Sequence, residues 1–548
     1  MRKRASERVL KARAASQSKV DLAKSPLWRV TLPFIGGLFA LSYTPHIAQH
    51  RILSKSFSTA VGGLLLWLAI LAWQTVRRRR VLTFDFVPRR QHYVQACVQA
   101  FIFLYWGWYW RTVYDSALLI VAQIVFAYAF DSLLGWSRRD KWTLGFGPLP
   151  IIFSTNIFLW FKNDWFYLQF VMVAVGFLAK EFIRWPREGR LTHVFNPSAF
   201  SLGLFSFILV LTRSSDLTWG NRIAGTLFMP PQIYVVLFLL GLIAMYFFFT
   251  TLVAASAATT LFALSAAYTG LTGVYWFVDS NIPIAVFLGL HLLVTDPATS
   301  PRSLPGKAIF GIAYGILVFV TNGILAWFNA PTFYDKLLPI PILNLTVRAI
   351  DRLADSNFLE RFLKRRWSLQ LTPRQLNVVF MSVWIIFFIT MNGIGAVGDT
   401  HPGRRVPFWQ RACAEGRMNG CQNLINTEEQ YCNNGSGWAC NELGTQLTEG
   451  KIIRQDHLRA AQTLELACQY GFAVACTNSM LSLVNASGVE MLHDEPRVED
   501  YPILLEEGKG VLPPLPRAEI LRRACNQGWT KACAEIQGAS YSPMRRSR

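Results

Sequence analysis

The sequence predicts an all-α protein with two parts, a polytopic helical membrane bundle and a C-terminal array of cysteine-containing repeats. Three observations support this prediction. Hydrophobic residues make up 52% of the 548 residues and charged residues only 16%, whereas a soluble domain is about one quarter charged. Apolar stretches of roughly 20 residues, the length that crosses a bilayer, follow one another up to residue 397. Eight of the nine cysteines lie beyond them, in pairs with one spacing.

The basic residues, which give the chain a net charge of +21, cluster between the apolar stretches. This distribution is typical of membrane proteins and argues against nucleic acid as a partner. Residues 1–26 are predicted to be a cytoplasmic tail that also contacts anionic lipid. The apolar segment after them lacks a clear small-residue cleavage site, so we expect an anchor and not a removed signal peptide.

The membrane domain is predicted at 27–397, with about 13 spans, some of them short or broken by proline or glycine. The candidate spans are about 28–45, 57–76, 92–113, 115–136, 145–161, 164–184, 194–212, 231–250, 252–271, 278–294, 307–329, 334–352 and 374–397. Basic clusters follow the second, fourth, sixth and tenth spans and precede the last. An odd count with a cytoplasmic N-terminus places all of these clusters inside a bacterial inner membrane and the C-terminal domain in the periplasm.

The segment 334–352 is the least regular of the predicted spans. It contains Asp335, Lys336, Pro339, Pro341, Arg348, Asp351 and Arg352. An amphipathic helix on the membrane surface is the alternative. We predict a span, because without it the basic cluster Lys364–Arg366 would lie outside.

The cysteines of the tail form four pairs, each with seven residues between the partners. The pairs are Cys413 with Cys421, Cys432 with Cys440, Cys468 with Cys476, and Cys525 with Cys533. A repeated spacing indicates a repeat array, and an even number of cysteines favours disulfides, which persist in an oxidising compartment. Two Cys₄ zinc sites are the alternative, although zinc pairs are usually spaced by two to four residues.

Two polar stretches interrupt the apolar segments of the membrane domain. The first contains Lys180, Glu181, Arg184, Arg190, His193, Asn196 and Ser198, and the second contains His291, Thr295, Asp296 and Thr299. In the predicted topology both lie at cytoplasmic ends of spans. Asn-Pro and Asp-Pro each break a helix, and broken helices expose backbone groups that bind ions or ligands. The alternative is a pair of ordinary helix starts, with lysine and arginine reaching to lipid phosphates.

Around these residues the chain resembles the NqrB/RnfD family, the membrane subunits of Rnf complexes and of the sodium-translocating NADH:quinone reductase. Lys180-Glu181 followed by the Asn196-Pro197-Ser198-Ala199 stretch is similar to the family's Gly-Lys-Glu and Asn-Pro-Ala stretches, and 295–301 is similar to its Thr-Asp-Pro-Val-Thr stretch. The resemblance covers about 90–366. It implies a bundle of two related halves that holds flavin and transfers electrons, within an ion-coupled oxidoreductase and not as a stand-alone enzyme.

The resemblance also implies roles for the charged residues. Lys180, Arg184 and Arg190 would hold a phosphate or an anionic isoalloxazine. Glu181 and Asp296 would bind a cation or relay protons. The protein would supply placement and electrostatics, while the cofactor carries the redox chemistry.

Neutral residues of the two stretches complete the predicted site. Asn196, Thr295 and Thr299 would bond polar edges of the ring. His193 and His291 could ligate a haem if they faced each other, although the sequence contains no Cys-x-x-Cys-His motif. We expect FMN or riboflavin, held noncovalently, with quinone as a further ligand.

One departure from the family concerns the covalent attachment of flavin. The family attaches FMN to the threonine of a Ser-Gly-Ala-Thr motif in an external loop after the Asn-Pro-Ala span. The corresponding loop here contains Ala224-Gly225-Thr226, which is only a partial match. Thr226 is therefore kept as a candidate, and a branch without the covalent bond is the expected alternative.

The tail at 398–548 resembles cysteine-rich Sel-like repeats. Two of its units share Ala-Cys-x-x-Gly-x3-Ala-Cys, at 467–476 and 524–533. The resemblance implies an α-solenoid of helix hairpins, each closed by its own disulfide. The stretch 485–516 is predicted to be an insertion or long loop. Solenoids present concave surfaces to partners, so the tail is expected to dock a periplasmic protein.

Three functions remain open from the sequence. The first is an electron-transfer subunit of Rnf/Nqr type. The second is a scaffold that recruits other subunits to a membrane complex. The third is a transporter or channel built on the same broken helices.

Overall fold

The computed structural model describes residues 27–187, 189–354, 372–483, 491–505 and 515–540. The predicted basic tail at 1–26 and the cluster Lys364–Arg366 lie outside these residues. Helices dominate the described part, and the strands are short. The chain divides into two compact units. The first unit contains Met1–Ala224, Leu240–Ala254 and Gly289–Asn377, and the second contains Gly225–Leu239, Ala255–Leu288 and Val378–Arg548.

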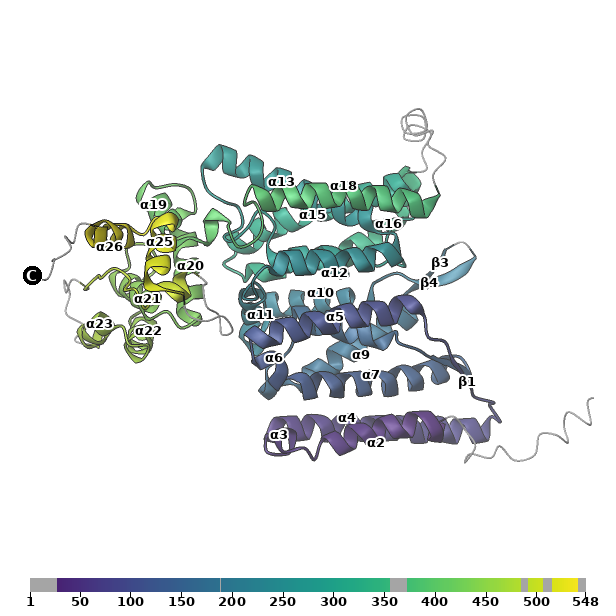
Figure 1. Cartoon of the computed structure of the whole chain (residues 1–548). Coiled ribbons are helices and arrows are strands. Elements are labelled where there is room, and N and C mark those ends of the chain that lie inside the picture. The colour runs from purple at the N-terminus through teal and green to yellow at the C-terminus, as the bar shows by residue number, and fades with distance from the viewer. Residues whose placement is uncertain (1–26, 188, 355–371, 484–490, 506–514, 541–548) are drawn as a thin grey trace, which may run out of the picture. The chain divides into compact units, whose positions relative to one another are not determined.

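The elements follow one another in three stretches of the chain (Figure 1). The first stretch contains η2 (Leu27–Thr31), α2 (Leu32–Leu41), α3 (Pro45–Ala48), α4 (Arg51–Arg77), β1 (Thr83–Phe86), α5 (Arg90–Tyr109), α6 (Thr112–Asp115), α7 (Ala117–Arg138), β2 (Lys141–Leu144), α8 (Pro148–Phe158), η3 (Asn163–Trp165), α9 (Tyr167–Phe182), β3 (Arg184–Arg187), β4 (Arg190–His193), α10 (Pro197–Leu211), η4 (Ser215–Leu217) and α11 (Gly220–Thr226). The second contains α12 (Ile233–Phe248), α13 (Thr251–Thr272), α14 (Ile284–Leu292), α15 (Leu304–Trp327), η5 (Thr332–Tyr334), α16 (Pro339–Ala354) and α18 (Pro373–Gly393). The third contains η6 (Pro402–Arg404), α19 (Val406–Ala414), α20 (Gly420–Asn433), α21 (Gly437–Glu449), α22 (His457–Gln469), α23 (Ala473–Leu483), α24 (Tyr501–Leu504), α25 (Arg517–Gln527) and α26 (Thr530–Ser540).

Five helices of the described residues are long and apolar enough to cross a membrane: α4, α7, α13, α15 and α18. Four further apolar helices are shorter, at Leu27–Leu41, Pro148–Phe158, Pro197–Leu211 and Ile233–Phe248. The long helices expose large apolar side chains, such as Leu66 in α4, Ile324 in α15 and Ile386 in α18. An aqueous surface disfavours such stripes, so these helices support association with a membrane.

The predicted span 334–352 becomes a 3-10 turn followed by helix α16. Its first two charged residues precede the helix as a buried ion pair, in which Lys336 Nζ lies 3.0 Å from Asp335 Oδ1. Helix α16 buries one face against α15 and α10 and exposes Ile342 and Leu345 on another. A helix in contact with lipid exposes apolar side chains, as α16 does. Its 16 residues are fewer than the roughly 20 that cross a bilayer.

Two pairs of short strands, which the all-α prediction did not include, lie in the first unit. β1 and β2 pair in parallel, and β3 and β4 form an antiparallel hairpin. The hairpin follows the end of α9 and reverses at Gly189, whose φ of +73° is a conformation that glycine adopts without strain. It ends at His193, three positions before Asn196 of the Asn-Pro break.

The third stretch of the chain forms pairs of helices closed by disulfides, as predicted. All four Cys-x7-Cys pairs are bonded, with Cα–Cα distances of 4.3–4.8 Å. The bonds join Cys413 with Cys421, Cys432 with Cys440, Cys468 with Cys476, and Cys525 with Cys533. The zinc alternative is therefore wrong, because all eight sulfurs are used in disulfides.

Side-chain caps fix the ends of two helices in this part. Ser436 and Asp456 cap α21 and α22, since their side chains accept hydrogen bonds from Ala439 N and Arg459 N. Each cap satisfies a backbone donor that the first turn of a helix leaves without a partner. The helices of the hairpins therefore start at positions that the local sequence defines.

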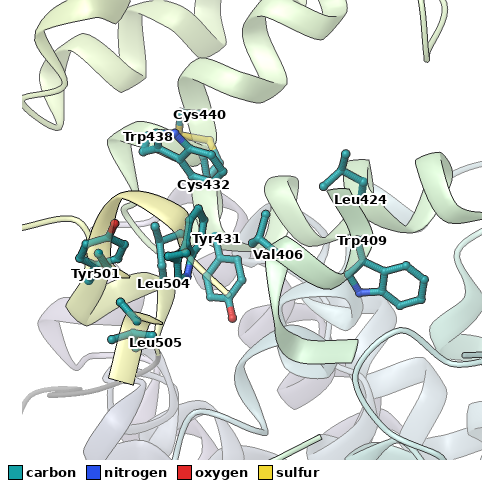
Figure 2. Close-up of a cluster of buried hydrophobic side chains, with 14 of the residues drawn as sticks. Val406, Trp409, Leu424, Tyr431, Cys432, Trp438, Cys440, Tyr501, Leu504 and Leu505 are labelled. Atoms are coloured by element: carbon teal, nitrogen blue, oxygen red, sulfur yellow. A yellow bond between two sulfur atoms is a disulfide. The ribbon is translucent and has the colours of Figure 1, made fainter. Parts of the chain in front are cut away.

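The core of this part contains aromatic residues from several helices (Figure 2). Tyr431 and the Cys432–Cys440 disulfide lie near Trp438 and Tyr501, and all of them are buried. Tyr501 and Leu504 come from the stretch 485–516 that the sequence analysis predicted to be an insertion or long loop. The described part of that stretch adds these two side chains and Leu505 to the core.

Candidate functional site

A cavity of about 550 Å³ lies among the helix ends of the first unit. All of its lining residues belong to that unit. Pro197 and Pro297, the prolines of the two predicted breaks, both line it. The two polar stretches, which are about 100 residues apart in the sequence, therefore border one space. Pockets of roughly 300–1,000 Å³ accept drug-sized ligands.

The first break is built by Asn196, which caps α10. Its Oδ1 accepts hydrogen bonds from the Ser198 hydroxyl at 2.8 Å and from the backbone N–H groups of Ser198 and Ala199 at 3.1 and 3.3 Å. Its Nδ2 donates to the Leu293 carbonyl at 3.1 Å. Most of the hydrogen-bonding capacity of Asn196 is thus used inside the protein. The side chain holds the two breaks together, because Leu293 belongs to the second.

The second break follows α14 and is organised by Asp296. Its Oδ1 accepts from Ala298 N at 3.0 Å, and its Oδ2 accepts from the Thr299 hydroxyl at 3.1 Å. His193 Nε2 lies 3.9 Å from Oδ2, which is an ion-pair distance. Burial alone would raise the pKa of the Asp296 carboxyl, but its contact with His193 and these hydrogen bonds outweigh burial and lower that pKa. The Thr295 hydroxyl donates back to the His291 carbonyl at 2.8 Å.

Helix α16 joins the two breaks through Asn344, a residue that the sequence analysis missed. Asn344 Oδ1 accepts from Asn196 N, and Asn344 Nδ2 donates to the Thr299 carbonyl, both at 3.2 Å. The asparagine is 1% exposed. An amide on the buried, apolar face of an amphipathic helix was the available signal, because such a group needs partners for both its donor and its acceptor.

A second set of contacts, which the sequence analysis also did not predict, anchors the β3–β4 hairpin beside the second break. Arg187 donates to the Ser300 carbonyl at 3.1 and 3.2 Å and pairs with Asp351 Oδ2 at 2.9 Å. Arg348 donates to the Pro186 carbonyl at 2.7 Å. These bonds connect β3 of the hairpin with α16 and with the second break.

Charged residues predicted from the first stretch line the cavity as an ion-pair cluster. Glu181 accepts from Arg139 at 2.8 Å and from Arg184 at 2.6 Å. Lys180 Nζ lies 3.9 Å from Asp131 Oδ1 and 5.3 Å from the centre of the Phe177 ring. Lys180 thus has the loosest contact of the three cations, and it is the one best able to bind an incoming anion.

Three histidines, His92, His193 and His291, also line the cavity. His291 is 2% exposed and lies against Gly241 of α12, where a Cβ atom would overlap its ring. Among the described residues, no group of three or more His, Cys, Asp or Glu side chains is placed to hold a metal ion.

Buried amide side chains lie in the helices that contribute to the cavity or pack next to them. Ser154 lines the cavity and accepts from Gln99 Nε2 at 2.7 Å. Gln99 is 0% exposed, and its Oε1 accepts no hydrogen bond from the described residues. Gln123, Asn156 and Gln169 form a second buried cluster with bonds of 2.8–3.0 Å. An unpaired buried acceptor costs about 1–3 kcal/mol, so a donor group on a ligand or water would stabilise Gln99.

Two predicted site residues, Thr299 and Thr226, do not line the cavity. The Thr299 hydroxyl instead donates a hydrogen bond to Asp296, which does line the cavity. Arg190 lies in β4, and its side chain is outside the described part of the structure. Thr226 is the last residue of α11 and is 4% exposed. A phosphoester at Thr226 would need a hydroxyl open to its reagents, which this degree of burial disfavours.

The lining of the cavity combines apolar side chains with a cation. Trp142, Phe248 and Leu292 are apolar, and Lys180 is charged. An aromatic ligand with an anionic end has the complementary chemistry. Comparison with known protein families, with characterised proteins and with solved structures gives no match to this chain.

Proposed function

We propose that the protein is an electron-transfer subunit of the bacterial inner membrane, which binds a flavin (FMN or riboflavin) or a quinone noncovalently in this cavity. One observation carries the proposal: the Asn196-Pro197 and Asp296-Pro297 breaks border the same space. Polar residues at membrane-embedded breaks are costly unless they bind a partner. The proposal keeps the resemblance to NqrB/RnfD subunits as its chemical precedent.

In this proposal each group at the cavity has a separate task. Lys180 and Arg184 hold the anionic end of the ligand, and the apolar walls exclude water from its ring. Thr295 and Asp296 fix the backbone at the second break. Asp296 with His193 forms the pair that exchanges protons when the bound group changes its charge. The cofactor, when bound, supplies the redox chemistry.

The proposed topology has about 13 spans, with the N-terminus in the cytoplasm and the repeats in the periplasm. Short helices such as α8, α10 and α14 would then be parts of broken spans. The disulfide-closed hairpins would form a solenoid whose surface docks a periplasmic protein, alongside other subunits in the membrane. The disulfides support this side of the membrane, because they persist where conditions are oxidising.

The test is an absorbance spectrum of the protein purified from membranes, followed by extraction and identification of any bound cofactor. We expect a flavin band that dithionite bleaches, or an extractable quinone. Lys180→Gln should lower cofactor content, while Lys451→Gln, an exposed lysine of the repeats that pairs with Glu449, should leave it unchanged. Cofactor-free protein, with neither flavin nor quinone after gentle extraction, would contradict the proposal.

A transporter is the second candidate, and the buried amide clusters favour it. Gln99 and the Gln123–Asn156–Gln169 group place polar atoms in membrane helices, where such atoms can mark a solute path. Reconstituted protein would then move solute across liposomes without any chromophore. If both assays are blank and other subunits copurify, the protein is a non-redox scaffold.

A further inference from the structure

The ends of three helices, α4, α7 and α9, lie close together in the first unit. These helices contact one another pairwise, and they lie side by side in Figure 1. The Trp67 indole donates to the Ser137 hydroxyl at 3.0 Å. Arg80, just after α4, pairs with Asp140, just after α7, at 2.6 Å. The basic residues at these helix ends therefore form one cluster.

The arginines of this cluster fall into two groups. Arg80 and Arg139 are locked in ion pairs with Asp140 and Glu181. The other group is exposed and has no carboxylate partner among the described residues: Arg77, Arg78, Arg79 and Arg138. Four exposed guanidinium groups at these helix ends therefore have no ion pair with a carboxylate of the described chain, and positive charges close together repel one another. A bound anion would relieve this repulsion.

Two of these four arginines lie over exposed aromatic rings. The Arg77 guanidinium is 5.1 Å from the centre of the Trp73 ring, and that of Arg138 is 4.9 Å from the Phe182 ring. Trp73 and Phe182 are 58% and 55% exposed. Stacking on a ring orients a guanidinium and leaves its N–H edge available for a phosphate.

Apolar side chains continue from this cluster along α4. Ile70 and Leu66 lie one and two turns before Trp73 and are 45% and 64% exposed. A soluble anion would contact only the arginines. An amphiphile would contact the arginines with its headgroup and the apolar stripe with its acyl chains.

We propose that Arg77, Arg78, Arg79 and Arg138 bind the phosphate of an anionic phospholipid, with Trp73 and Phe182 at the level of its glycerol. Charge complementarity and the adjoining apolar stripe both select this class of ligand. Basic surfaces at the cytoplasmic face attract anionic lipids. The proposal depends on α4, α7 and α9 meeting the bilayer surface and is independent of any redox cofactor, so it can fail without the proposed function failing.

The experiment measures binding of phosphatidylglycerol to the full-length protein in mild detergent by native mass spectrometry, with phosphatidylcholine and inorganic phosphate as parallel probes. The double variant Arg77→Gln with Arg138→Gln removes two of the four arginines. The control, Arg51→Gln with Lys55→Gln, removes two exposed positive charges at the other end of α4. We expect about fivefold weaker phosphatidylglycerol binding per arginine, hence about 25-fold for the first variant, and little change for the control.

Trp73→Ala distinguishes binding at a defined site from general attraction between charges, because it removes the ring beneath Arg77 and keeps every charge. It should weaken phosphatidylglycerol binding by roughly twofold to fivefold. Equal losses in the two double variants, or equal binding of phosphatidylcholine, would overturn the proposal. So would inorganic phosphate competing as well as the lipid does, since a free anion would then be the ligand. The absorbance spectrum of each variant should match that of the wild type.

Discussion

The disulfide-closed repeats and the cavity of the first unit are both defined by a few polar or sulfur contacts, but those contacts differ in their span along the chain. Each disulfide joins residues eight apart. At the cavity, Asn196 bonds with Leu293 and Asn344, which are 97 and 148 residues away, and Arg187 pairs with Asp351 across 164 residues. Local bonds close each hairpin independently. The cavity exists only when distant segments have all been placed.

Among the local contacts, removing one buried disulfide should have the largest effect on stability. Cys432 and Cys440 are both buried, at 5% and 0% exposure, so replacing both with alanine loses loop closure and packing together. We expect a loss of about 2–5 kcal/mol in the stability of the repeats, measured by denaturant unfolding. Alanine at both Cys413 and Cys421, a less buried pair, should cost less. Equal losses would show that packing around the buried sulfurs contributes little.

Among the long-range contacts, those of Asn344 should matter most: Asn344→Ala should lower the free energy of unfolding by about 2–3 kcal/mol. It leaves the Asn196 N–H and the Thr299 carbonyl buried without this partner. Because these groups connect the two breaks, cofactor content should fall together with thermal stability. Leu345→Ala, at the next residue and 59% exposed, is the control and should change neither. Normal stability and cofactor content in Asn344→Ala would contradict the role of this bridge.

Acid should weaken the second unit through His401. Gly403 N–H donates to its Nδ1 at 3.1 Å, so Nε2 carries the proton and bonds Asn281 Oδ1 at 3.0 Å. Burial, with Arg404 and Arg405 nearby, lowers the pKa of His401 to about 3. The unfolded chain takes up a proton near pH 6.5 and the folded chain does not, so stability falls as pH decreases below 6.5.

Between pH 6.5 and pH 5 this loss should reach about 2 kcal/mol. Hydrogen exchange of the amides around His401 measures it directly. His401→Gln should be less stable at neutral pH and should lose most of this pH dependence. An unchanged slope in the variant would assign the effect to another group.

The smallest expected effect comes from His493. Its contribution to stability is lost as pH rises, whereas that of His401 is lost as pH falls. His493 Nδ1 lies 3.1 Å from Glu442 Oε2, and this hydrogen bond, with the charges of Glu442 and Glu449, raises the pKa of His493. The stabilisation is complete below pH 6.5 and is lost as pH rises through the higher folded pKa. The side chain is half exposed, so we expect less than about 1 kcal/mol. His493→Gln should abolish this alkaline loss, while His457→Gln should retain it.

The parts of the fold that depend on neighbouring residues were predictable from the sequence. The four disulfides follow from a spacing that a helical hairpin closes. The Asn196-Pro197 break follows from capping chemistry within three residues. The membrane character follows from composition, and five long apolar helices agree with it.

Contacts between distant segments were not predictable in this way. The parallel pairing of Thr83 with Lys141 depends on how α4 and α7 end together, and nothing within either strand indicates it. Asn344 looks like an ordinary polar residue of a helix until its two partners are placed. The sequence predicted an insertion or long loop at 485–516, but the packing of Tyr501 and Leu504 in the repeat core was not predictable, because acidic and proline residues around them concealed it.

A density map of the protein in lipid nanodiscs, recorded by electron cryomicroscopy, tests the central claim most directly. We expect density for a flat molecule between Pro197 and Pro297, with its charged end toward Lys180. Side chains closing that space, or water alone within it, would contradict the account.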